Sequence, residues 1–402
     1  MSIFPAEIVA QDEDGPPTPL LTAARTARLI SLAQSLLRMP TVNPPGNEAV
    51  AAAFLADRLR DVGLEARTVP CGDGRASCVA RLRGSSSRTG LILTGHLDVV
   101  PTGSIPWRHP PLAGTVDGDR LHGRGSVDMK GAVAAMVDAA ITLAEAGDSL
   151  RGDLILALTA GEEVDMRGAQ SLASGGHLNG ASAIIVGEPT GFDLAIAEKG
   201  SYRLDIAVHG RAAHASTPHL GANAIGAGAD LVQRIEALVP SAIPHPLLGT
   251  PTLSVGVIRG GSAANVVPDW CEIEVDARTI RRHEIEGMLD LVRATAEDLA
   301  QARGVTFDLT YSGFPPVETA ADAAIVIATA AAVRSVARRA PEILGARYAT
   351  DAAILAPMLG LPFVICGPGD PALAHQRDES VPLGELAQAS AVYEAIAREW
   401  LA

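Results

Sequence analysis

The sequence predicts an α/β protein whose main domain is interrupted by a separate β-α-β-β-α-β block. Short apolar runs at 91–93, 154–158 and 363–366 are each followed by polar residues, as in the buried strands of a largely parallel sheet. Residues 201–311 instead show strand and helix patterns in the split β-α-β order. With 402 residues, the chain is long enough to form more than one hydrophobic core.

Each element of the block is predicted from its own pattern. Apolar residues alternate from Tyr202 to Val208, which indicates a half-buried strand at 201–209. The remaining elements are expected as a helix at 223–238, strands at 252–258 and 271–278, a helix at 283–302 and a strand at 305–311. Outside the block, residues 131–147 predict a helix with one apolar face that stops at Gly147.

The segment T-G-H-L-D-V-V-P at 94–101 places His96 and Asp98 at the end of the first apolar run. In an open α/β sheet, ligands and metals sit at the carboxyl ends of the strands. Residues two apart on an extended segment share a face, so the Asp98 carboxylate is expected behind the His96 imidazole, where it would fix the tautomer. Taken alone, however, a histidine that ends a strand is more simply a packing residue.

Further segments place acidic or histidine residues after other apolar runs or before a helix. They are H-G-R-G-S-V-D-M-K-G with Asp128, T-A-G-E-E-V with Glu162 and Glu163, I-I-V-G-E-P-T with Glu188, and G-P-G-D-P-A-L-A-H with His375. Each has an ordinary explanation as a loop, turn or surface residue. Together they predict one rim with two histidines and several carboxylates, a set that suits a divalent metal of borderline softness and zinc best.

In this order, the motifs resemble the metallopeptidase and aminoacylase family that includes acetylornithine deacetylase, succinyl-diaminopimelate desuccinylase and carboxypeptidase G. The resemblance runs from about His96 to the C-terminus. It implies a zinc-peptidase-like catalytic domain, formed by residues 1–197 and 313–402. It also implies that residues 198–312 form an inserted ferredoxin-like (βαββαβ) lid and dimerisation domain.

The resemblance also implies a site for two Zn²⁺ ions, with Co²⁺ as a substitute. One zinc would be held by His96, Asp128 and Glu188, and the other by Asp128, Glu163 and His375, so that Asp128 is the bridge. In the family, the peptide bond after the bridging aspartate is cis.

Two residues beside the ligands receive roles from the same resemblance. Glu162 matches the family's general base, which is kept off the metal so that it can accept a proton from water and hand it to the leaving amine. Asp98 matches the partner of His96.

The inserted block carries polar residues of its own. His214 lies in G-R-A-A-H-A-S-T-P, Asn265 in G-G-S-A-A-N-V-V-P, and Arg278 in D-A-R-T. From the residues alone, a surface loop, an Asx-turn and a solvated arginine explain them. The resemblance implies that His214 stabilises the tetrahedral oxyanion, in dimeric members at the neighbouring subunit's site. It implies that Arg278 and Asn265 hold the substrate's carboxylate, for which a planar guanidinium is suited.

One segment departs from the family pattern. Where many relatives have a glycine-rich stretch, this chain has G-A-R-Y-A-T-D-A-A-I-L with bulky Arg347 and Tyr348, although Thr350 and Asp351 keep the expected pair. This departure leaves open the acyl group and amino acid that the pocket accepts.

Composition favours a cytoplasmic enzyme. The net charge of −14 argues against nucleic acid or an anionic membrane as the main partner. No apolar run approaches the ~20 residues that span a bilayer. The acidic, proline-rich N-terminus lacks the features of a signal peptide and is expected to be a loosely ordered tail.

The cysteines show no C-x-x-C spacing, so a cysteine zinc site is not expected. Cys271 and Cys366 lie in strand-like runs and are expected to be buried. A pair between Cys71 and Cys78 is supported only by their proximity in the sequence.

The motifs and the resemblance together imply a homodimeric di-zinc amidohydrolase that cleaves an N-acyl amino acid bearing a free carboxylate. A metal-dependent dipeptidase or carboxypeptidase with the same site is the alternative enzyme. A non-catalytic metal or amino-acid binding protein is the alternative from another class. Glu162 argues against the binding protein, because a binder needs the ligands but not an unliganded glutamate beside the water.

Overall fold

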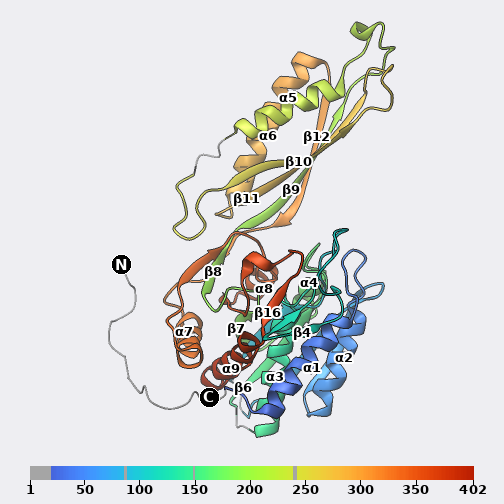
Figure 1. Ribbon diagram of the computed structural model, residues 1–402. Helices are drawn as coiled ribbons and strands as arrows, with labels where there is room; N and C mark the ends of the chain where they lie inside the picture. The colour runs from blue at the N-terminus through green and yellow to red at the C-terminus, as the bar shows by residue number, and fades with distance from the viewer. Residues whose placement is uncertain (1–19, 86–87, 148–149, 239–241) are drawn as a thin grey trace.

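A computed structural model describes residues 20–85, 88–147, 150–238 and 242–402. The predicted N-terminal tail lies outside these residues. Among them, nine strands form the larger sheet, in the order β1-β2-β6-β3-β7-β15-β8-β13 with β14 beside β8 (Figure 1). Its strands are β1 (Glu65–Gly72), β2 (Arg75–Leu82), β3 (Arg88–His96), β6 (Gly152–Thr159), β7 (Ala181–Val186), β8 (Leu194–Glu198), β13 (Val317–Glu318), β14 (Ile343–Ala346) and β15 (Phe363–Ile365).

The centre of this sheet is parallel, as the apolar runs predict. Strand β3 pairs in parallel with β6 and β7, and β7 pairs in parallel with β15. Side chains of these strands belong to cores on both faces, which explains why their sequences are apolar without alternation. Because the strands run in one direction, the residues that follow them meet at one edge of the sheet.

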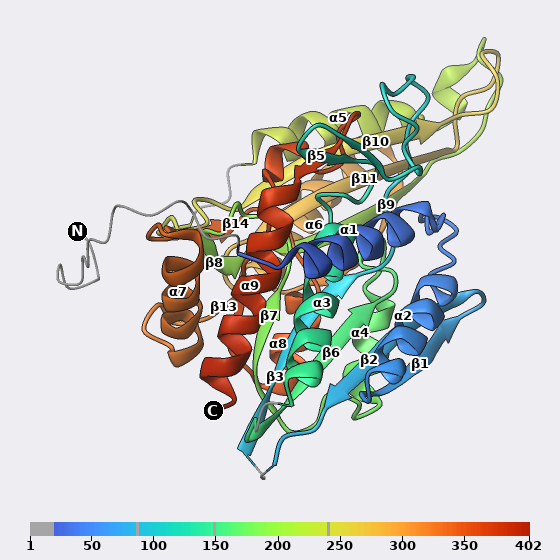
Figure 2. The same cartoon turned by 60° about the horizontal axis from the view of Figure 1, so that its bottom comes forward.

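Helices cover both faces of the sheet (Figure 2). One face packs against α1, α2, α3, α7 and α9, and the other against α4 and α8. The bounds of these helices are α1 (Ala23–Arg38), α2 (Ala49–Asp61), α3 (Lys130–Ala146), α4 (Arg167–Ser174), α7 (Ala324–Ala337), α8 (Ala352–Leu359) and α9 (Leu383–Trp400).

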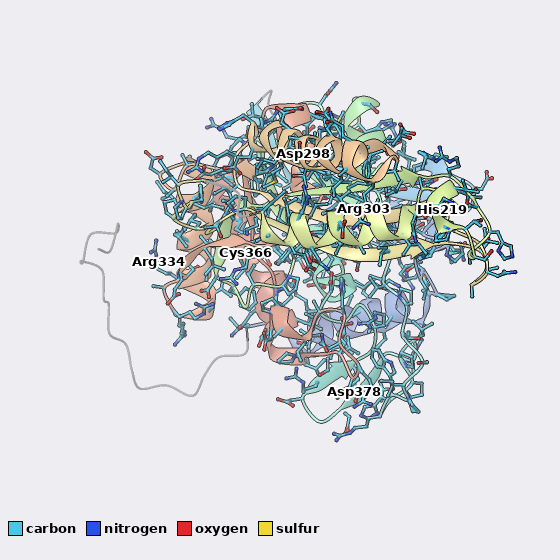
Figure 3. The ribbon with its side chains drawn as sticks, turned by 90° about the horizontal axis from the view of Figure 1, so that it is seen from above. His219, Asp298, Arg303, Arg334, Cys366 and Asp378 are labelled. Atoms are coloured by element: carbon cyan, nitrogen blue, oxygen red, sulfur yellow. The ribbon has the colours of Figure 1, made fainter. Side chains whose placement is uncertain are left out.

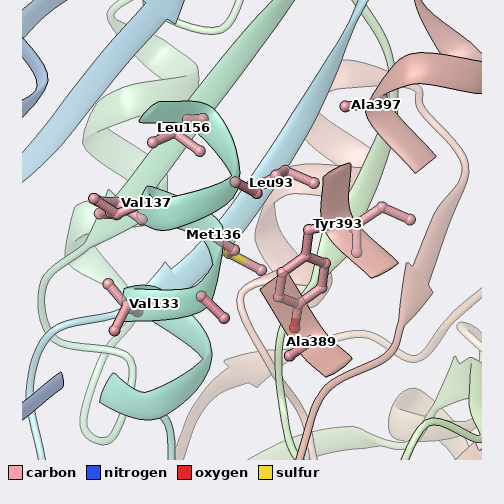
Figure 4. Packing of buried hydrophobic residues seen from close by; sticks show 14 of the residues in the cluster. Leu93, Val133, Met136, Val137, Leu156, Ala389, Tyr393 and Ala397 are labelled. Carbon is pink, nitrogen blue, oxygen red and sulfur yellow. The ribbon is translucent and has the colours of Figure 1, made fainter. Parts of the chain in front are cut away.

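Helix α3 differs from the amphipathic helix that the sequence predicts. It ends at Gly147, as expected, with that glycine at a φ of 66°. However, every residue from Lys130 to Ile141 is buried, because α3 lies between the sheet and the helices α1 and α9. Figure 4 shows Met136 and Tyr393 in this packing. The Lys130 ammonium donates to the carbonyls of Leu36 and Met39, and burial lowers its pKa to about 7.

The second unit has its own antiparallel sheet. In the described part of the chain its four strands follow the order β10-β11-β9-β12, with α5 and α6 packed on the sheet (Figure 1). Its elements are β9 (Gly200–His209), α5 (Ala224–Ala237), β10 (Thr252–Gly260), β11 (Trp270–Thr279), α6 (Glu284–Arg303) and β12 (Thr306–Phe314), with the short 3₁₀ turn η1 (Pro218–Leu220) before α5. This is the β-α-β-β-α-β order that the sequence predicts, and the alternating residues of β9 are buried as expected.

Strand β9 carries the chain away from the larger sheet. Its first residue follows β8 by two positions, and its last residue lies at the opposite end of the second unit. At ~3.3 Å per residue, a strand of this length spans roughly 30 Å. Figure 3 shows the unit from above, with Asp298 and Arg303 on α6 and with His219 toward one end.

A small sheet joins parts of the chain that are distant in the sequence. Within the described residues it has three strands in the order β16-β5-β4, where β4 is Thr115–Asp117, β5 is Arg120–His122 and β16 is Ser380–Pro382. The 3₁₀ turn η2 (Pro371–Leu373) lies between β15 and β16. His122 pairs with Ser380, so the segment before Asp128 is tied to the segment after His375.

The cysteines are unpaired, and two of them are buried as the sequence predicts. Cys71, Cys78, Cys271 and Cys366 are all free thiols, and Cys271 and Cys366 are buried. A Cys71–Cys78 disulfide is therefore not formed. No helix in the described residues is long and apolar enough to cross a membrane.

Candidate metal centre

The five metal ligands implied by the sequence come together at one edge of the larger sheet. His96 ends β3, Glu163 follows β6, and Glu188 follows β7. Asp128 lies in the loop that precedes α3, and His375 lies in the loop that follows η2. The fold thus brings together side chains that are far apart in the sequence. His96 and His375, the first and the last of them, are separated by 279 positions.

Asp128 lies between the two histidines. Its Oδ1 is 2.9 Å from His96 Nε2, and its Oδ2 is 3.1 Å from His375 Nε2. Each carboxylate oxygen therefore faces a different imidazole, which is the arrangement that a bridging carboxylate requires. The peptide bond between Asp128 and Met129 is cis, as the resemblance implies.

One glutamate accompanies each histidine. Glu188 Oε1 is 3.5 Å from His96 Nε2, and Glu163 Oε2 is 3.1 Å from His375 Nε2. Glu188 thus lies beside His96 and Glu163 beside His375, and ligand atoms of His96, Asp128 and Glu163 also lie within 4.8 Å of one another. His96 is buried, whereas the His375 side chain is 51% exposed, so the site opens to solvent on the His375 side.

Asp98 makes different contacts from those expected. His96 Nδ1 lies 2.9 Å from the Asp98 backbone carbonyl, while the nearest Asp98 carboxylate oxygen is 3.7 Å away. The carboxylate instead accepts hydrogen bonds from the backbone N–H groups of Gly161, Glu162 and Glu163, at 2.9 to 3.2 Å. Asp98 thus holds the segment that carries the two glutamates, and its backbone, rather than its carboxylate, orients His96.

Two further residues support Asp128, and the sequence analysis did not identify them. Glu379 accepts hydrogen bonds from the backbone N–H groups of Val127 and Asp128, at 2.8 and 3.1 Å. Arg124 donates to Glu379 at 2.5 Å, and both side chains are buried. Arg124 lies in the G-R-G motif, but no local pattern links it to an acid more than 250 positions later.

A Glu379→Ala variant tests this support. It would leave the Arg124 charge and two backbone donors buried without their partner, which typically costs about 3 to 5 kcal/mol. We expect urea denaturation to show a loss of that order. Glu342→Ala, at an exposed position, is the matched control and should change the free energy of unfolding by less than about 0.5 kcal/mol. An equal, small change in both variants would contradict the role of Glu379.

The electrostatics of the site favour a bound cation. Burial alone would lower the pKa of His96, but the hydrogen bond to Asp128 and the charges of Glu188 and Asp128 raise it well above its ordinary value. Hydrogen bonds to Asp128 and Glu163 raise the pKa of His375 to about 10. Burial, together with neighbouring carboxylates, raises the pKa of Glu188. The carboxylates therefore draw positive charge into the site, and the imidazole and carboxylate donors fit divalent ions of borderline softness.

Glu162 lies beside this arrangement. One of its carboxylate oxygens is within 4.8 Å of ligand atoms of both His96 and Glu188. Burial raises its pKa well above the ordinary value, and Glu188 and Glu163 raise it further while His96 lowers it. A carboxylate with a raised pKa next to a metal site is a better proton acceptor than an ordinary glutamate.

The segment that departs from the family pattern borders the site. Burial raises the pKa of Tyr348, and the charges of Glu188 and Asp128 raise it further, so its phenol lies within electrostatic reach of the ligands. Thr350 donates to Glu198 at 2.8 Å, and the Asp351 carboxylate accepts from Thr159. Burial raises the pKa of Asp351 to about 7. Thr350 and Asp351 therefore make internal contacts.

The residues of the inserted block do not join the others in this structure. His214 and Asn265 occupy adjacent loops, where the Ala215 N–H donates to the Asn265 carbonyl at 3.0 Å. Arg278 pairs across the sheet with Ser201, near the larger sheet, and its guanidinium contacts Asp276 at 2.8 Å. Because β9 separates its two ends by roughly 30 Å, His214 and Arg278 lie at opposite ends of the second unit.

Comparison with known proteins places this geometry in a family. Residues 92–399 match Peptidase family M20/M25/M40, and this range contains all five candidate ligands. The chain belongs to this family. It is therefore a hydrolase of the metal-dependent class that cleaves amide bonds, as the sequence predicts.

Curated relatives cover most of the M20 chain. The acetylornithine deacetylase of Myxococcus xanthus is 34% identical over 359 residues, which are 85% of this chain and 87% of the relative. A probable succinyl-diaminopimelate desuccinylase of Staphylococcus epidermidis is 29% identical over 387 residues, which are 88% of this chain and 92% of the relative.

The fold is also that of solved M20 structures. The crystal structure of the YXEP protein of Bacillus subtilis, described as a dinuclear metal binding peptidase from the M20 family, matches with a TM-score of 0.72. The match covers 94% of this chain and 99% of that chain at 18% identity. At this identity the likeness concerns the fold alone.

Proposed function

We propose that this chain is a di-zinc amidohydrolase that removes the acyl group from an N-acyl amino acid with a free carboxylate. The observation that carries the proposal is the position of Asp128, with one oxygen toward each histidine, and of Glu162 beside the site. Both relatives described above are named as enzymes that remove an acyl group from an amino acid.

The chemistry follows from the division of roles among these residues. Two bound zinc ions would hold and acidify a shared water molecule. Glu162 accepts a proton from the attacking water and delivers it to the nitrogen of the leaving amine. The zinc ions would be bound by His96, Asp128, Glu163, Glu188 and His375. Asp98 accepts a hydrogen bond from the Glu162 backbone N–H and so keeps the Glu162 carboxylate within reach of the water molecule.

Positive charge near the junction of the two units supports an anionic substrate. Burial lowers the pKa of Lys199, and the charges of Arg347 and Arg278 lower it further, so the three cations lie within electrostatic reach of one another. Glu284 opposes this effect. A substrate carboxylate would relieve the repulsion. The Arg278 guanidinium donates two hydrogen bonds to Asp276, at 2.8 and 3.0 Å, and would exchange this carboxylate for that of the substrate.

A panel of substrates tests the proposed function. N-acetyl, N-succinyl and N-formyl amino acids are compared with dipeptides, with added Zn²⁺ or Co²⁺. We expect kcat/KM to be highest for one class of acylated amino acid and to fall when its carboxylate is esterified. Faster cleavage of dipeptides than of every acylated amino acid would favour the dipeptidase alternative. Metal binding without hydrolysis of any member would favour a binding protein.

We also propose that the enzyme works as a homodimer in which residues 198–312 act as lid and dimerisation domain. The position of His214 supports this arrangement, because β9 holds it far from Arg278 in its own chain. Closure of a dimer would bring His214 and the adjacent Asn265 to the zinc site of the other chain, where His214 would donate to the developing oxyanion. Asn265 would then hold the substrate's carboxylate together with the Arg278 that belongs to the same chain as that zinc site.

A His214→Ala variant should lower kcat by ~10² to 10³, the usual effect of removing an oxyanion donor, and leave the metal content unchanged. Mixing it with inactive Glu162→Gln under conditions of subunit exchange should restore part of the activity, because one site of a mixed dimer has both residues. The control is His219→Ala, an exposed histidine in the same region. Subunit exchange without recovery, or a fully active monomer, would contradict action in trans.

A further inference from the structure

A second group of potential metal ligands lies apart from the candidate metal centre described above. His109 belongs to the loop between β3 and β4, Asp117 ends β4, and His122 ends β5. Each residue offers one ligand atom, and these three atoms all lie within 4.8 Å of one another. The register of the β4–β5 hairpin explains the arrangement. Asp117 pairs with Arg120, so Asp117 and His122 are diagonal neighbours across the hairpin.

The two imidazoles are unusually placed for histidines that only pack. Their ring centroids are 4.4 Å apart, with the planes tilted by 39°. His109 Nε2 and His122 Nδ1 are both shielded from solvent, and neither has a hydrogen-bond partner among the described residues. The Asp117 carboxylate is 3.4 Å from His109 Nε2, but not in hydrogen-bonding geometry. Buried polar atoms without partners are rare, and each calls for an explanation.

We propose that His109, Asp117 and His122 bind one divalent cation, separate from the catalytic pair. Two imidazole nitrogens and one carboxylate oxygen are donors of the borderline type, for which zinc is the best-matched ion. The cation would give both unpartnered nitrogens a ligand bond. Because the Asp117 side chain is 66% exposed, the ion can reach the site from solvent and keep water as a fourth ligand.

Charged side chains around the site act in both directions, because Asp117 would attract a cation whereas Arg120 and Arg108 would repel it. Burial lowers the pKa of His122, and the charges of His109, Arg120 and Arg108 lower it further while Asp117 raises it. Arg120 is engaged by the Ser380 hydroxyl at 2.9 Å and by the Ser380 carbonyl at 2.7 Å.

A cation at this position would fasten the loop of His109 to the small sheet. That sheet joins β5 to β16, and the chain runs from His122 directly into the loop that carries Asp128. Two backbone N–H groups of the same loop, those of Val127 and Asp128, donate hydrogen bonds to the Glu379 carboxylate. The bound cation would therefore fix the start of the segment that runs from His122 to the proposed ligand Asp128. Its role would be structural.

The test counts zinc bound to the full chain. Wild-type protein, His109→Gln, His122→Gln and the double variant are dialysed against the same buffered free zinc and analysed for metal and protein. We expect each single variant to bind one zinc fewer per chain than the wild type, and the double variant to lose no more than either. His209→Gln, which removes an exposed histidine of the second unit, should bind as much zinc as the wild type.

Two outcomes would overturn the proposal. The first is an equal zinc count in the wild type and in both folded single variants, which would leave the two histidines as a pair of packed rings. Should a histidine variant fail to fold, Asp117→Asn replaces an exposed side chain and should weaken binding of the additional zinc at least tenfold. Unchanged affinity in Asp117→Asn would be the second such outcome. The readout is bound metal, so it is independent of the proposed hydrolytic function.

Discussion

An Asp128→Ala variant is expected to lose bound zinc and all measurable hydrolysis. The two oxygens of Asp128 face different histidines, so its removal takes a ligand from both proposed metal positions at once. Two cations ~3.5 to 4 Å apart would also face each other without the charge that screens them. The measurement is zinc content per chain after dialysis, together with the rate on the best substrate of the panel.

The Asp128 prediction has a matched comparison. His96→Ala removes a ligand from one position only, and it should lose metal and activity with more zinc retained than in Asp128→Ala. Asp322→Ala, at an exposed position, controls for the loss of an aspartate and should bind zinc normally. Full zinc occupancy in folded Asp128→Ala would exclude a bridging role.

Replacing Glu162 by Gln should lower kcat by ~10² to 10⁴ with the zinc content unchanged. The amide keeps the size of the side chain but cannot accept the proton of the attacking water. The proposed ligands remain, as do the hydrogen bonds that the backbone N–H groups of Gly161 and Glu162 donate to Asp98, so coordination should be intact. The two quantities to compare are kcat and zinc per chain. Loss of a general base should lower kcat alone, whereas loss of a ligand should lower both.

The neighbouring glutamate provides the control for this experiment. Glu163 lies 3.1 Å from His375 in the proposed ligand set, and Glu163→Gln should therefore weaken one zinc as well as the rate. If Glu162→Gln bound less zinc and Glu163→Gln bound it normally, the two roles would be reversed. Adjacent residues of the same type thus distinguish base from ligand without changing the composition of the loop.

Most strands and helices could be predicted from the sequence because their patterns are local. The alternation in β9 and the apolar runs of β3 and β6 depend on residues within a few positions of each other. The helix α3 shows the limit of this approach. Its local pattern indicates one apolar face, but its surroundings on several sides bury Lys130 and its neighbours as well.

The candidate ligands could be predicted for a related reason. Parallel strands share the direction in which they run, so polar residues that follow them meet at one edge wherever the strands lie in the sequence. The contacts of Asp98 could not be predicted in the same way. The spacing from His96 predicts that the two side chains share a face. In the structure, however, the Asp98 carboxylate accepts its hydrogen bonds from the backbone N–H groups of Gly161 and Glu162 rather than from His96.

The sequence by itself determined the types of residue at the metal centre, the order of the elements and the family to which the motifs belong. Only the tertiary structure decided which groups pair across long separations. Glu379 binds the backbone of Val127 from 252 positions away, and His109 meets His122 only because the hairpin and the preceding loop pack together. The physical reason is that such contacts depend on how whole helices, strands and loops pack against one another. The spacing of side chains along the chain does not determine that packing.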